Sequence, residues 1–286
     1  MEPRSLRVKG AHGLELHWLE WSREGVPLLL LHGFGNEAHL WDDFAPAVAP
    51  YYRVLAWDAR GHGDSAWDPE HRYEPETMAD DLECAARELG IERAVLVGFS
   101  MGGRVSTLFA GRHPERLAGL VLIDIGPEVD PRGTMRIRME VEQQRAPVFR
   151  SVEEYAEMLS LNYPAGQRAA LLRMARHGLR RRPDGKLELK MDPALREGMA
   201  RRGAGADEAE REFVAQQWDA LRRVPCPTLV VRGAASDILS PEVADRMVDE
   251  VLQAGRLAVV PRAAHSVMTD NPEGFAQAVC AFVLAE

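Results

Sequence analysis

The sequence predicts an α/β protein built on a doubly wound, mostly parallel sheet. Unbroken apolar runs of strand length recur along the chain, at residues 26–31, 53–58, 94–99, 117–124, 228–233 and 256–261. Such runs are typical of strands that are covered on both faces. Helical patterns separate several of them, at residues 41–49, 75–89, 100–113, 241–251 and 272–284. Strands that alternate with helices in this way form parallel sheets with helices packed on them.

Two departures from this alternation predict the rest of the architecture. Residues 5–9 and 14–21 flank a glycine-containing turn and predict an antiparallel hairpin ahead of the parallel strands. Between about residues 127 and 221 the strand runs stop and helical spacing replaces them, although a Pro-Asp-Gly turn at 183–185 predicts two short extended segments. We therefore expect a core domain of residues 1–126 and 222–286, with a mostly helical insertion of residues 127–221.

The composition argues against several classes of function. The 286 residues carry a formal net charge of −9, which disfavours binding to nucleic acid or to an anionic membrane. No segment approaches the roughly 20 apolar residues of a membrane span, and the first residues lack the apolar stretch of a signal peptide. The three cysteines match no metal-ligand or disulfide spacing, which predicts reduced thiols in a cytoplasmic protein.

The strongest chemical signal surrounds Ser100. Residues 98–102 read Gly-Phe-Ser-Met-Gly, directly after the apolar run 94–97 and at the start of a helical pattern. A tight strand-to-helix turn of this kind requires small residues two positions before and two after the serine, and it exposes the serine hydroxyl above the sheet. The helix N-terminus beneath the turn also favours developing negative charge. Ser100 is therefore the predicted nucleophile.

A serine hydroxyl needs a base that removes its proton, and the base needs an acid that orients it. His265 is the predicted base because it follows the late strand at 256–261 and precedes the final helix. Asp237 is the predicted acid because it follows the strand at 228–233 and precedes His265, the chain order expected for this arrangement. Asp124, at the end of the strand 117–124, is the alternative acid.

With these motifs the sequence resembles the α/β-hydrolase superfamily over nearly its whole length. Residues 30–35, Leu-Leu-His-Gly-Phe-Gly, are similar to the family's His-Gly motif, which implies that the backbone N–H groups of Phe34 and Met101 form an oxyanion hole. Residues 58–65, Asp-Ala-Arg-Gly-His-Gly-Asp-Ser, match a second family signature that we interpret as a structural turn braced by charge pairs. The resemblance implies an eight-stranded sheet with helices on both faces and a cap inserted after strand 6.

The resemblance and the triad together predict a serine hydrolase of the carboxylesterase or lactonase type. A serine at residue 100 argues against the haloalkane dehalogenase and epoxide hydrolase branches, which use a carboxylate nucleophile. The expected partner is a small to medium ester or lactone bound by a monomer or homodimer, and no metal or organic cofactor is needed. Six methionines of the insertion either line an apolar pocket or pack within the insertion, namely Met135, Met139, Met158, Met174, Met191 and Met199.

Three alternatives share the same triad. A C–C bond hydrolase acting on a vinylogous diketone needs cationic groups that bind a substrate carboxylate. Residues that could supply this charge are Arg136, Arg138 and Arg145, which otherwise are solvated residues on a helix face. An acyltransferase requires a pocket that excludes water. A ligand receptor on a hydrolase scaffold retains the triad for slow turnover or leaves it idle.

Overall fold

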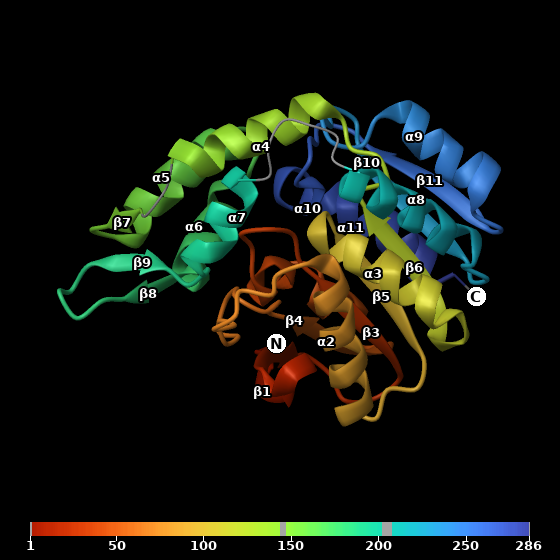
Figure 1. The fold of residues 1–286 in the computed structure, drawn as a ribbon, viewed down its shortest axis with the longest axis horizontal. Helices are drawn as coiled ribbons and strands as arrows, with labels where there is room; N and C mark the ends of the chain where they lie inside the picture. The colour runs from red at the N-terminus through yellow and green to blue at the C-terminus, as the bar shows by residue number, and fades with distance from the viewer. Residues whose placement is uncertain (1, 144–146, 202–207, 286) are drawn as a thin grey trace.

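The chain folds around an eight-stranded sheet, as the sequence predicted (Figure 1). A computed structural model describes residues 2–143, 147–201 and 208–285. The strands follow the order β1-β2-β4-β3-β5-β6-β10-β11. Their bounds are β1 Arg4–Lys9, β2 Glu15–Glu20, β3 Val26–Leu31, β4 Tyr52–Trp57, β5 Ala94–Phe99, β6 Leu117–Ile123, β10 Thr228–Gly233 and β11 Gly255–Val260. Within this sheet β2 pairs antiparallel with both β1 and β4, and the other described pairs are parallel, which confirms the predicted hairpin and the mostly parallel sheet.

Helices cover both faces of the sheet. One buried cluster packs the sheet against α2 (Pro75–Glu88), α3 (Met101–Arg112) and α8 (Glu208–Arg222). The other packs it against α1 (Ala45–Val48) and α11 (Pro272–Val283). Because side chains of alternate strand residues enter the two clusters, the central strands are apolar throughout, as in β5, where every residue is buried. The shorter elements are η1 Ala11–Gly13, η3 Pro114–Arg116, α9 Pro241–Arg246, η4 Met247–Val251 and α10 Val267–Asp270.

The helix expected at residues 41–49 is not continuous. The structure has the 3₁₀ helix η2 (Ala38–Trp41) and then the four-residue helix α1. Pro46 lies in the first turn of α1, where its missing N–H costs nothing, but it cannot donate to a preceding helical turn. The apolar spacing of this segment therefore reflects two short helices that share one buried face.

The chain between β6 and β10 contains α4 Pro131–Gln143, β7 Val148–Phe149, α5 Val152–Asn162, α6 Arg168–Gly178, β8 Leu179–Arg181, β9 Leu187–Leu189, α7 Pro193–Arg201 and α8. Figure 1 shows α4 running above the sheet, with α5, α6 and the small sheet beyond it. The expected turn joins β8 to β9, with Gly185 at a φ of 82°. Helices α5 and α6 share their own buried cluster, whereas Trp218 and Leu221 of α8 join the main core.

Two further findings concern bulk properties. No helix among the described residues is both long enough and apolar enough to cross a membrane. Cys84, Cys226 and Cys280 are free thiols, of which Cys226 is buried and the other two are partly buried.

Candidate active site

The turn between β5 and α3 has the strained geometry that its sequence requires. Ser100 has a φ of 51° and a ψ of −114°, a backbone conformation that residues other than glycine rarely adopt. A Cβ atom at residue 98 would lie 2.5 Å from the Ser106 hydroxyl, and one at residue 102 would collide with the carbonyl of Leu31. Gly98 and Gly102 are therefore required by close approach of the surrounding chain, and the turn lifts the Ser100 side chain above the sheet edge.

His265 contacts Ser100 as predicted. The imidazole lies in the loop between β11 and α10, with its Nε2 atom 3.0 Å from the Ser100 hydroxyl oxygen. The ring also packs against Phe99, at a centroid distance of 5.0 Å. Its Nδ1 atom is 2.9 Å from Oδ2 of Asp124, which is fully buried at the end of β6. This arrangement places the proton on Nδ1 and leaves Nε2 to accept the serine proton.

Two donors besides His265 hold the Asp124 carboxylate in place. The Gly233 N–H donates to Oδ1 at 2.9 Å, while the Ser236 hydroxyl donates to Oδ2 at 2.5 Å, beside His265. The Ser236 oxygen accepts the N–H groups of Ile238 and Leu239, at 3.0 and 3.1 Å, so its own proton is directed to the carboxylate. Asp124 therefore remains a fixed acceptor for the imidazole.

The expectation that Asp237 orients His265 is wrong. Its carboxylate instead accepts two hydrogen bonds from Arg136 of α4, at 2.7 Å from Nε and 2.8 Å from Nη2. This guanidinium lowers the pKa of Asp237 below its usual range. Because β6 and β10 are neighbours in the sheet, Asp124 and Asp237 both reach the same edge, but only Asp124 points at the imidazole.

The two amides expected in an oxyanion hole are available. Met101 is the first residue of α3, so its N–H has no acceptor within the helix. In the described part of the chain, the Phe34 N–H also makes no intramolecular hydrogen bond. The loop that carries Phe34 is fixed by His32, which donates from Nδ1 to the Gly33 carbonyl and accepts the Ala59 N–H at Nε2.

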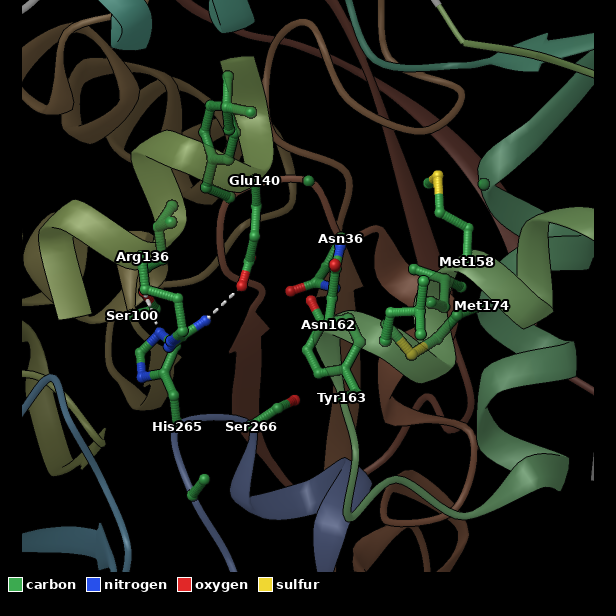
Figure 2. Close-up of a pocket in the computed structure, with 18 of the residues that line it drawn as sticks. Asn36, Ser100, Arg136, Glu140, Met158, Asn162, Tyr163, Met174, His265 and Ser266 are labelled. Carbon is green, nitrogen blue, oxygen red and sulfur yellow. Dashed lines mark hydrogen bonds and ion pairs between the residues drawn. The ribbon is translucent and has the colours of Figure 1, made fainter. Parts of the chain in front are cut away.

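A cavity of about 350 Å³ opens in front of Ser100 and His265. Figure 2 shows Arg136 beside Ser100 and His265, and Met158 and Met174 across the cavity; Arg136 forms an ion pair of 2.9 Å with Glu140. The cavity thus has a polar end at the serine and an apolar end formed by the insertion. Of the six methionines, Met158, Met174 and Met191 line it, whereas Met135 and Met139 are exposed.

Burial raises the pKa values of two carboxyl groups of the cavity wall. Desolvation raises the pKa of Glu37 well above its usual value and also raises the pKa of Asp270. Arg136 is already paired with Glu140 and Asp237. The positive charge of Arg136 at the cavity wall is therefore balanced by carboxylates.

The segment 58–65 is a structural turn. Arg60 is fully buried and donates twice to Asp81 and once to Asp68, at distances of 2.6 to 2.9 Å. Asp58 accepts from His17 and from two backbone N–H groups, so the carboxylate is saturated by internal donors. This segment therefore stabilises the loops beneath the site through internal hydrogen bonds and ion pairs.

Sequence reasoning missed two residues of the site. Ser236 donates to Asp124, and the sequence signal for it is a hydroxyl residue that follows the strand next to the one that Asp124 ends. The role of Arg136 depends on how α4 lies over the sheet, which no local pattern specifies. Arg138 is absent from the residues that line the cavity in the described chain, and Arg145 lies outside the described residues.

Comparisons with known proteins agree with this geometry. A family model described as alpha/beta hydrolase fold matches residues 26–272. Esterase Rv0045c of Mycobacterium tuberculosis is 26% identical over 272 residues, which cover 91% of this chain and 84% of the relative. A C–C hydrolase of Metapseudomonas resinovorans, 2-hydroxy-6-oxo-6-(2'-aminophenyl)hexa-2,4-dienoic acid hydrolase, is 27% identical over 97% of this chain and 90% of its own length.

A solved structure shares the whole fold. The crystal structure of an alpha/beta hydrolase from Novosphingobium aromaticivorans superposes with a TM-score of 0.82 and 31% identity, covering 97% of this chain and 96% of that protein. The matched family model spans most of the chain, including the serine turn and the histidine loop. The chain therefore belongs to the alpha/beta hydrolase fold family.

Proposed function

We propose that this protein is a serine hydrolase that cleaves a small to medium carboxylic ester or lactone through an acyl-enzyme on Ser100. The observation that carries the proposal is the hydrogen-bonded line from Asp124 through His265 to the Ser100 hydroxyl, with distances of 2.9 and 3.0 Å. Nucleophile, base and orienting acid are within the reach that proton transfer requires. The esterase and the dienoic acid hydrolase among its relatives support a hydrolytic reaction.

The reaction begins when His265 accepts the Ser100 proton at Nε2 and the serine oxygen attacks the substrate carbonyl. The N–H groups of Phe34 and Met101 stabilise the oxyanion that forms. His265 then protonates the leaving alcohol, and the acyl group remains on Ser100. A water molecule deprotonated by the same histidine releases the acid. Asp124 stabilises the imidazolium in both steps without taking its proton.

The cavity sets the substrate class. A volume of about 350 Å³ is at the small end of ligand pockets. Met158 and Met174 form adaptable apolar surface opposite the serine, which suits an aliphatic or aromatic acyl chain. The C–C hydrolase alternative needs a cation for the substrate carboxylate, but Arg136 already has two carboxylate partners. The geometry therefore favours an ester or lactone.

Hydrolysis of a p-nitrophenyl ester tests the proposal. Wild-type protein should release a burst of p-nitrophenol equal to the enzyme concentration, followed by steady turnover. Ser100→Ala should abolish both the burst and labelling by a fluorophosphonate. Ser160→Ala, at an exposed serine of α5, is the matched control and should leave both unchanged. A slow release without a burst would support the receptor alternative, and activity confined to a coloured dienone acid would support the C–C hydrolase.

A further inference from the structure

A group of metal-binding side chains lies outside the proposed active site, where the insertion meets the core. His39 belongs to η2, Asp42 directly follows that helix, and His177 is the penultimate residue of α6. One potential ligand atom from each residue lies within 4.8 Å of the others. All three residues are partly buried, so they are shielded but remain accessible to an ion from solvent.

The separation of the His39 and Asp42 ligand atoms is close to that in a tetrahedral metal site. The Nδ1 atom of His39 is 3.0 and 3.2 Å from the two carboxylate oxygens of Asp42. Ligand atoms bound at about 2.0–2.1 Å to a tetrahedral zinc ion lie roughly 3.4 Å apart. The rings of His39 and His177 are stacked, with centroids 3.6 Å apart and planes inclined at 23°. Rotation of these side chains would turn one nitrogen of each ring toward a shared ion.

The local charge also suits a cation. Arg173 lies one helical turn before His177 and makes two hydrogen bonds to Asp43, at 3.0 and 2.5 Å. Its Nε atom is farther from Asp42, at 3.9 Å from Oδ2. Arg173 therefore faces two carboxylates. Of the other cations near His177, Lys190 is paired with Asp64 at 2.8 Å, and Arg176 offsets part of the negative charge of Asp42.

We propose that His39, Asp42 and His177 bind a divalent transition metal ion, with zinc as the type case, and that the ion joins α6 to η2. Two imidazoles and one carboxylate are ligands that such ions prefer, and water completes the coordination. Glu37 and Gly178, close in sequence to the ligands, line the cavity. The ion would therefore stiffen the cavity wall without touching Ser100, and the site does not depend on the proposed ester chemistry.

Calorimetric titration of zinc chloride into the full-length, chelator-treated protein tests this proposal. We expect one ion per chain and a rise in Tm on binding. His39→Ala, His177→Ala and Asp42→Asn should each weaken binding at least about tenfold. His71→Asn is the matched control, because His71 is exposed and has a φ of 53° that asparagine tolerates; this variant should bind zinc normally.

A further variant separates this site from the proposed active site. His265→Asn should bind zinc as the wild type does. Absence of binding at zinc concentrations up to about 1 mM, unchanged affinity in the ligand variants, or loss confined to His265→Asn would overturn the proposal. Loss in only one of the two histidine variants would also overturn it, because the ion is proposed to bridge the two segments. Asp42→Asn, which keeps the shape of the side chain, provides the result if an alanine variant does not fold.

Discussion

Replacing Asp124 by asparagine should almost abolish turnover, and the hydrogen bonds of the carboxylate explain why. Oδ2 accepts from His265 and Ser236, and Oδ1 accepts from the Gly233 N–H. An amide has only one acceptor atom. If its NH₂ group faces His265, the imidazole must carry its proton on Nε2 and can no longer accept the Ser100 proton. If the NH₂ group faces Gly233, two donors oppose each other in a fully buried position.

The expected loss follows from the loss of the base. An asparagine in place of the acid of such a triad lowers kcat by about 10⁴-fold, equivalent to roughly 5 kcal/mol of transition-state stabilisation. Asp237→Asn is the matched control: it removes a partly exposed ion pair with Arg136, for which we expect less than about a tenfold change. Steady-state kinetics on a p-nitrophenyl ester, with circular dichroism to verify folding, measures both. A larger loss in Asp237→Asn than in Asp124→Asn would refute the reasoning.

Two further predictions concern groups around the triad. Ser236→Ala should lower kcat about ten- to hundredfold with little change in KM, because a hydrogen bond to a charged group contributes about 1.5–3 kcal/mol. Ser236→Thr, which keeps the hydroxyl group, should retain most of the activity. Equal losses in the two variants would contradict a positioning role for Ser236. Burial lowers the pKa of His62 from 6.5 to about 3, so the unfolded chain binds a proton that the folded chain does not between these values. The free energy of unfolding should therefore be highest above pH 6.5. It should decrease as the pH falls, by about 1.3 kcal/mol from pH 7.0 to 5.5. His62→Gln should reduce this decline in urea unfolding, and an unchanged pH dependence would argue against a buried neutral imidazole.

The parts of the site that the sequence predicts are those set by local constraints. The Ser100 turn requires small residues at fixed offsets, because the carbonyl of Leu31 and the Ser106 hydroxyl leave no space for a Cβ. His265 follows a strand whose parallel neighbours all end at the same sheet edge, so chain order alone brought it near Ser100. The strand positions can be predicted equally well, because the buried parallel strands are apolar on both faces and therefore form unbroken apolar runs in the sequence.

A local sequence pattern does not determine whether Asp124 or Asp237 is the acid that orients His265. Asp124 and Asp237 follow adjacent strands, and Ile123 and Val231 are partners in that pairing. A sequence pattern identifies where each strand ends but not where the following side chain points. That direction depends on tertiary contacts, namely the Gly233 and Ser236 donors for Asp124 and the guanidinium on α4 for Asp237. The placement of α4 depends in turn on packing across the whole insertion.

The pairing of Ser236 with Asp124 has a consequence for the loop between β10 and α9. Consecutive residues of this loop contact different parts of the molecule: the Ser236 hydroxyl donates to the buried Asp124, and the Asp237 carboxylate accepts from Arg136 of α4. Lengthening or shortening the loop by a single residue would displace both side chains at once. The position of the Asp124 carboxylate and the attachment of α4 thus depend on the same short stretch of backbone, so an insertion or deletion in it would disturb both.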